Sequence, residues 1–295
     1  MSVRQEIRTA LLFLGPGLGA LGVFFFLPVL AALAMSFTDF DIYSLGNWTF
    51  ARFVGLKNYS NLFSDPLFWK ALQNTLYFLL VGGPLSIACS LATALLLQAK
   101  VARFRGFFRT VYFAPVVTTL VAVAVVWRFV YHPRFGLLNY GLSFLGISPV
   151  DWLGDPDWAM PAIILLAVWK NFGYNMIIFI AGLQSIPREL YEAASIDGAG
   201  PWKQFTTITV PMLAPTTMFI TIVTMIGYLQ LFSEPYVMTQ GGPLDATLSI
   251  VLLMYEQGFR WWSMGYSASV AFVLFGLILA ASIIQARVGK GSIIR

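Results

Sequence analysis

Long apolar stretches without a charged side chain dominate the hydrophobic pattern of this chain. Each can supply the roughly 20 apolar residues that a helix needs to cross a bilayer. The uncharged intervals are Thr9 to Thr38, Ala71 to Ala99, Thr110 to Trp127, Gln204 to Ser233 and Trp261 to Ala286. The pattern predicts a membrane-spanning helix in each of them.

A further apolar stretch, Trp158 to Leu183, is interrupted midway by Lys170. Apolar runs on both sides of the lysine favour a span here as well. We therefore predict six spans in a single transmembrane domain over residues 1–295, at about 10–36, 71–98, 110–131, 158–183, 212–238 and 264–286.

The connections carry weaker signals. Pro115 lies inside the predicted third span and predicts a kink, which a membrane helix tolerates when its neighbours satisfy the freed carbonyl. The loop from His132 to Asp157 contains tryptophan and tyrosine and predicts a short interfacial helix. The single cysteine, Cys89, lies within the second span and is interpreted as a packing residue.

Composition supports a membrane location. The chain is 58% hydrophobic and 11% charged, and its mean hydropathy of +0.77 leaves too little polar surface to cover a soluble globule. The fold class predicted is an all-α polytopic membrane protein. A formal charge of +5 could indicate a nucleic-acid partner, but the basic residues lie in short loops and at the termini, so we expect none.

The distribution of these basic residues predicts the orientation. Positively charged residues concentrate on the cytoplasmic side of membrane proteins. With both termini cytoplasmic, eleven of the 18 lysines and arginines face inward: Arg4, Arg8, Lys100, Arg103, Arg105, Arg109, Arg188, Lys203, Arg287, Lys290 and Arg295. The first apolar run is too long for a cleaved signal and is predicted to stay as a helix.

The predicted cytoplasmic loop 184–211 differs from the other connections because it has the pattern of a structured element. Pro187 suits a first helical turn, good helix formers follow, and Gly198 and Gly200 are expected to stop the helix with positive backbone angles. Pro201 then restarts a helix. The small residues Ala193 and Ala194 would let another surface approach closely. From the residues alone, docking to a partner and simple capping of two spans both remain open.

Polar residues inside the spans are costly and therefore suggest function. They are accompanied by aromatic side chains, which suit a sugar because ring faces pack on its C–H surfaces while amides bond its hydroxyls. An alternative is that Lys170 and Glu234 form a buried structural ion pair and that the aromatic residues only pack. The candidates are Trp169, Lys170, Asn171, Tyr174 and Asn175 in the fourth span, with Tyr228, Gln230 and Glu234 in the fifth. No metal-binding constellation is present.

At loop 184–211 the chain resembles a known family. Residues 186–200, Ile-Pro-Arg-Glu-Leu-Tyr-Glu-Ala-Ala-Ser-Ile-Asp-Gly-Ala-Gly, followed by Ile-Thr-Val-Pro at 208–211, resemble the EAA motif of ATP-binding-cassette (ABC) importer permeases of the carbohydrate-uptake group. Further blocks resemble those of the family: Gly55–Tyr59, Asn74-Thr75, Tyr112–Pro115, Gly136–Asn139 and Thr239–Pro243. The last of them resembles the block typical of maltose F-type and glycerol-phosphate A-type permeases.

The resemblance implies an ABC type I importer permease that moves a sugar, or a related polyol or glycerol phosphate, by alternating access in the bacterial inner membrane. It implies a second, homologous permease subunit, a dimer of cytoplasmic ATPase subunits, an extracytoplasmic solute-binding protein and surrounding lipid. The chain itself would be no enzyme and would bind no cofactor. Its sequence lacks the phosphate-loop pattern, so ATP and Mg²⁺ would be bound by the partner ATPase.

The same resemblance assigns site residues. Contact with the ATPase would fall to Tyr191, Glu192, Ala193, Ala194, Asp197, Gly198, Ala199, Gly200 and Pro201. Trp169, Lys170, Asn171 and Tyr174, together with Gly227, Tyr228 and Leu231, match sugar-contacting positions of the maltose-type permease. Several of them differ in residue type, which indicates a solute other than maltose.

Two other classes of function explain the sequence less well. A secondary transporter driven by protons or sodium could use Lys170 and Glu234, but it leaves the structured cytoplasmic loop unexplained, and no internal repeat is visible in the sequence. A membrane scaffold that transports nothing explains neither the loop nor the charges inside the spans.

Overall fold

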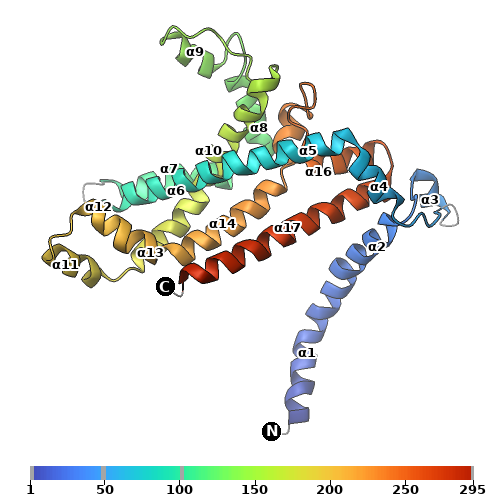
Figure 1. Cartoon of the computed structure of the whole chain (residues 1–295), viewed down its shortest axis with the longest axis horizontal. Helices are drawn as coiled ribbons and strands as arrows, with labels where there is room; N and C mark the ends of the chain where they lie inside the picture. Colours follow the sequence, from blue (N-terminus) through green and yellow to red (C-terminus); the bar gives the residue numbers. More distant parts are fainter. Residues whose placement is uncertain (1–2, 48–50, 100–102, 294–295) are drawn as a thin grey trace. The chain divides into compact units, whose positions relative to one another are not determined.

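The computed structural model describes residues 3–47, 51–99 and 103–293, and this part of the chain is helical almost throughout (Figure 1). Within it, the one β pairing is an isolated bridge between Thr38 and Phe53. Lys100 and Arg295, used above for the predicted orientation, lie outside the described residues. The α-helices are α1 Val3–Leu21, α2 Leu27–Ser36, α3 Ile42–Gly46, α4 Lys57–Ser64, α5 Pro66–Tyr77, α6 Gly83–Gln98, α7 Arg105–Val117, α8 Leu120–Val130, α9 Leu137–Ser143, α10 Pro156–Gln184, α11 Arg188–Ile196, α12 Pro201–Gln204, α13 Val210–Met212, α14 Ala214–Leu229, α15 Ser233–Met238, α16 Ile250–Tyr255 and α17 Met264–Ile293.

Five helical stretches in the described residues are long and apolar enough to cross a membrane. They are Leu11–Ser36, Pro66–Gln98, Pro156–Gln184, Ala214–Met238 and Met264–Arg287. A sixth span results if α7 and α8 are counted together, although the two are bent by 101° at the break between them. The expected all-α membrane fold is thereby confirmed, with five candidate spans, or six if the bent pair counts as one.

Short π-helical turns interrupt several of these spans. Three of them, Gly22–Phe26, Phe78–Gly82 and Phe205–Thr209, are each followed within two residues by a proline. Proline has no N–H to donate, and its ring crowds the carbonyl of the preceding turn, so a wider turn before it relieves the clash. Two of the spans therefore continue through Pro28 and Pro84, and the π-turn before Pro211 leads into the short helix α13 ahead of the span that begins at Ala214.

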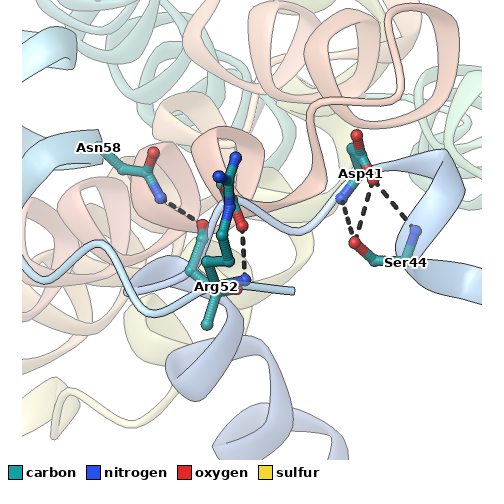
Figure 2. Close-up of polar contacts among 6 residues, drawn as sticks. Asp41, Ser44, Arg52 and Asn58 are labelled. Atoms are coloured by element: carbon teal, nitrogen blue, oxygen red, sulfur yellow. Dashed lines mark hydrogen bonds and ion pairs between the residues drawn. The ribbon is translucent and has the colours of Figure 1, made fainter. Parts of the chain in front are cut away.

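The chain divides into two compact units. Unit 1 comprises Met1–Phe68 and Leu253–Phe275. In it, Asn58 of α4 donates hydrogen bonds of 2.8 Å to the carbonyl oxygens of Ser36 and Thr38, at the end of α2 (Figure 2). These carbonyls would otherwise lack helical partners, so Asn58 holds the segment that follows the first span against its C-terminus.

The same figure shows how the next residues of unit 1 are ordered. Asp41 caps α3 by accepting bonds from the backbone N–H groups of Tyr43 and Ser44. Asp39 accepts from the backbone N–H of Arg52 at 2.7 Å and pairs with its guanidinium at 3.0 Å. The backbone N–H of Arg52 has the largest effect on the pKa of Asp39, which it lowers, and the Arg52 guanidinium lowers that pKa further. The stabilisation is therefore present above the unfolded-state pKa and is lost as pH falls, and it is small because the Arg52 side chain is exposed.

Unit 2 comprises Trp69–Leu252 and Gly276–Arg295. Its long central helix α10 packs along α6 and α7, and α14 packs on both α6 and α10 (Figure 1). At Gly173, α10 passes so close to α7 that an added Cβ would overlap the carbonyl oxygen of Tyr112 and lie 3.2 Å from the Cα of Phe113. A glycine at this position lets the two backbones meet.

Several local expectations need adjustment. The predicted kink at Pro115 becomes a full break over residues 118–119, and the helix before it begins at Arg105, ahead of the predicted start of the third span at about residue 110. Pro187 lies just before α11 instead of in its first turn. Gly198 has the expected positive φ of 75°, but Gly200 has φ −68° because it begins α12 as its N-cap.

Candidate solute cavity and coupling loop

A cavity of about 370 Å³ lies within unit 2, where α10, α14 and α15 meet the break between α7 and α8. Aromatic, amide and hydroxyl side chains share its lining with aliphatic ones. The lining residues are Phe78, Val116, Leu120, Asn171, Tyr174, Asn175, Val223, Thr224, Gly227, Tyr228, Gln230, Leu231, Phe232, Ser233 and Glu234.

Eight of the ten predicted solute-site residues line this cavity. They are Asn171, Tyr174, Asn175, Gly227, Tyr228, Gln230, Leu231 and Glu234. Trp169 and Lys170 do not line it. Residues 171, 174 and 175 share one face of α10 because they are three or four positions apart. Lys170 is also four positions from Tyr174, but its ammonium donates to the carbonyls at the break between α7 and α8. Trp169 instead packs on Trp127 of α8, with ring centroids 5.3 Å apart.

The cavity walls are organised by contacts that the sequence did not indicate. Tyr228 stacks on Phe78, with ring centroids 4.7 Å apart. An added Cβ at Gly82 would lie 2.8 Å from the Tyr228 ring, so this glycine makes room for it. Asn175 donates a 3.0 Å hydrogen bond to the hydroxyl of Thr224, which joins α10 to α14. Asn175 was among the predicted candidates, whereas Thr224 was not; its position four residues before the predicted Tyr228 is the signal that could have found it.

Lys170 binds the break in the third span. Its buried ammonium, 8% exposed, donates to the carbonyl oxygens of Pro115 and Thr118 at 3.0 Å and of Val116 at 3.5 Å. These groups lie where α7 ends, so they have no helical N–H to accept from. Among the residues that the structure describes, Lys170 makes no ion pair with Glu234. The structural ion pair given above as an alternative is therefore not formed.

Replacing Lys170 with methionine should therefore destabilise unit 2. The change keeps most of the side-chain volume but removes the donor of the Val116 and Thr118 carbonyls and leaves the Pro115 carbonyl with the Thr118 hydroxyl alone, which we expect to cost about 3 kcal/mol. The apparent Tm of the detergent-solubilised protein, followed by fluorescence-detected gel filtration, measures the effect. Lys170→Gln, which retains an N–H donor, should lose less. Equal Tm values for Lys170→Met and the wild type would contradict this role.

The loop between α10 and α14 has a defined helix-turn-helix geometry. The N–H of Ala199 bonds the carbonyl of Ala194 at 2.8 Å, and that of Gly198 bonds Ser195 at 3.1 Å, which is the Schellman pattern that a left-handed glycine allows. The amide of Gln204 then donates to Ser195 Oγ and to the Ala199 carbonyl, both at 2.9 Å. The turn is thus bound to both helices.

This loop exposes most of the residues predicted to contact an ATPase. Tyr191, Ala194 and Ala199 are half-buried, and the Tyr191 hydroxyl lies 2.9 Å from Thr209 Oγ1. The exposed members are Glu192, Ala193, Asp197, Gly198, Gly200 and Pro201. Two large apolar side chains that the sequence reasoning did not select, Ile196 and Trp202, are 87% and 76% exposed. A rigid loop that presents apolar side chains has the features of a docking element.

Comparisons with known proteins agree with this geometry. The family model described as binding-protein-dependent transport system inner membrane component matches residues 90–292. The chain is 39% identical over 279 residues to the lactose transport system permease protein LacF of Rhizobium radiobacter, covering 93% of this chain and 91% of that protein. It is 35% identical over 286 residues to the trehalose/maltose transport system permease protein MalF of Thermococcus litoralis, covering 97% and 95%.

Solved structures share the fold. A chain of the bacterial alginate ABC transporter, in complex with an alginate pentasaccharide-bound periplasmic protein, superposes with a TM-score of 0.83 at 22% identity, over 99% of both chains. The expected resemblance to importer permeases is confirmed by these matches. This chain is a multi-pass inner membrane protein, and it belongs to the family of binding-protein-dependent transport system inner membrane components.

Proposed function

We propose that this chain is the permease subunit of an ATP-driven importer that moves a neutral di- or oligosaccharide into the cytoplasm by alternating access. The observation that carries the proposal is the cavity, in which Tyr174 and Tyr228 face a set of amides and hydroxyls. Aromatic faces pack on the C–H surfaces of sugars while amides bond their hydroxyls. Relatives named for lactose, for trehalose and maltose, and for arabinooligosaccharides support this solute class.

The loop from α11 to α12 would couple this cavity to a separate ATPase dimer that binds ATP and Mg²⁺. A second permease subunit would complete the translocation pathway, and an extracytoplasmic binding protein would deliver the solute. Both termini and the loop would face the cytoplasm. Force applied to the loop would reach α14 through the π-turn Phe205–Thr209 and the short helix α13, which ends two residues before α14 begins.

Uptake into proteoliposomes tests this function. Vesicles that hold this chain with its partner permease, ATPase and binding protein should accumulate radiolabelled sugar when ATP is enclosed with the ATPase. The probes are lactose, maltose, trehalose and arabinooligosaccharides. Vesicles with this chain alone should accumulate none. Accumulation by the chain alone that an ionophore dissipates would overturn the proposal in favour of a secondary transporter.

A further inference from the structure

The charge of the cavity wall comes from one side chain. Of the described residues that line the cavity, Glu234 alone has a carboxyl group, and none is lysine, arginine or histidine. Glu234 is the second residue of the short helix α15 and is 9% exposed. The other polar lining groups are amides and hydroxyls, which can bond either a neutral or a charged solute.

The nearby lysine does not neutralise this carboxylate by contact. The three carbonyls at the break between α7 and α8 hold the Lys170 ammonium. It acts on Glu234 only through space. Near the carboxylate lies its own backbone N–H, and in the described part of the chain no cation is within ion-pair distance of it. The carboxyl group of Glu234 therefore makes no ion pair in the described part of the chain, and an ionised Glu234 acts on whatever enters the cavity.

We propose that the Glu234 carboxylate determines charge selectivity in this cavity, admitting hydroxyl-rich solutes without net negative charge and disfavouring anionic ones. Two like charges a few ångströms apart repel strongly when protein replaces most of the surrounding water, whereas sugar hydroxyls donate well to a carboxylate. The inference rests on the proposed function, in that the cavity takes a sugar. The charge selectivity of Glu234 would admit neutral sugars and disfavour uronates and phosphorylated polyols.

A thiol probe measures this charge effect without knowledge of the solute. Gly227 lines the cavity and has open space where a Cβ would be added, so Gly227→Cys places a thiol there in a Cys89→Ala background. The probes are the cationic trimethylammonioethyl and the anionic sulfonatoethyl methanethiosulfonates, with rates normalised to 2-mercaptoethanol. The cation-to-anion rate ratio should exceed one, and Glu234→Gln should lower it about tenfold. Because both reagents attack the same thiol, its own reactivity cancels in the ratio.

Glu256→Gln is the control for the thiol experiment. It removes one carboxylate outside the cavity and should leave the cation-to-anion rate ratio unchanged. An unchanged ratio in Glu234→Gln overturns the inference. If that variant does not fold, a ratio near one at the Gly227→Cys thiol, with Glu234 intact, overturns it equally.

A second experiment, with sugars as probes, distinguishes failure of this inference from failure of the proposed function. Methyl β-glucoside and methyl β-glucuronide differ only at C6, and saturation-transfer NMR on the full chain in lipid nanodiscs compares their contacts. The wild type should favour the glucoside, and Glu234→Gln should bring the glucuronide signal close to it. If neither sugar contacts the wild type while the thiol ratio still shifts, the sugar function fails and the charge effect stands.

Discussion

Replacing Ile196 or Trp202 by aspartate is expected to abolish ATP-driven uptake while the chain still folds and inserts. Both side chains are largely exposed, so unit 2 loses little packing when they change; for Trp202 the loss is its contact with Phe205, at 5.6 Å between ring centroids. In the assembled importer they would enter an apolar cleft of the ATPase. Losing a central apolar anchor of an interface typically costs 2 kcal/mol or more, about 30-fold in affinity, and a desolvated carboxylate adds to that.

Co-purification of the ATPase with the tagged permease, followed by uptake in proteoliposomes, measures this effect. Leu244→Asp is the matched control: it is also an exposed apolar residue, 86% exposed, but it lies beyond the other end of the span formed by α14 and α15. That variant should retain the ATPase. If Ile196→Asp and Trp202→Asp both retained the ATPase at the wild-type level, the loop would not be the docking element.

Gly173→Ala should prevent unit 2 from reaching its native packing. The added methyl group would overlap the carbonyl oxygen of Tyr112, and a backbone atom in another helix cannot rotate away as a side chain can. Either α7 separates from α10 or both helices distort, at a cost of about 3 kcal/mol. Separation would also pull the carbonyls of the break away from Lys170, so the two losses would reinforce each other.

The yield and Tm of the monodisperse protein in detergent report this outcome. Gly276→Ala makes the same substitution inside the α17 span, at a glycine with no atom near the added Cβ. Because alanine favours helix over glycine, that variant should keep or slightly raise the wild-type Tm. A Gly173→Ala protein as stable as Gly276→Ala would show that α7 and α10 do not approach as closely as the structure has them.

The spans and the helix-turn-helix of loop 184–211 were predictable because both depend on local sequence. A run of about 20 apolar residues has one low-energy conformation in a bilayer. Likewise, Gly198 ends α11 through backbone angles that other residues adopt with difficulty. The second glycine was mispredicted because Gly200 and Gly198 look alike in sequence, while only their hydrogen bonds decide which one turns the chain and which one begins α12.

The environment of Lys170 could not be predicted, because it depends on where another helix ends. Pro115 indicated that the third span would bend. Nothing local showed that the break would fall at residues 118–119, or that α10 would carry its lysine to that point. Charge complementarity therefore suggested Glu234 as the partner. The carbonyls of a broken helix form an equally good acceptor for an ammonium group, and they are invisible to a search for opposite charges.

The break in the third span also bears on how the protein is made. Helix α7 has 13 residues and α8 has 11, so each is about 20 Å long or less, shorter than the roughly 30 Å hydrocarbon core. Neither half can cross alone, and the carbonyls between them need a donor. That donor is Lys170, more than 50 residues later in the chain. We expect the nascent third span to remain at the translocon until α10 has been synthesised, so that the two enter the lipid as a pair.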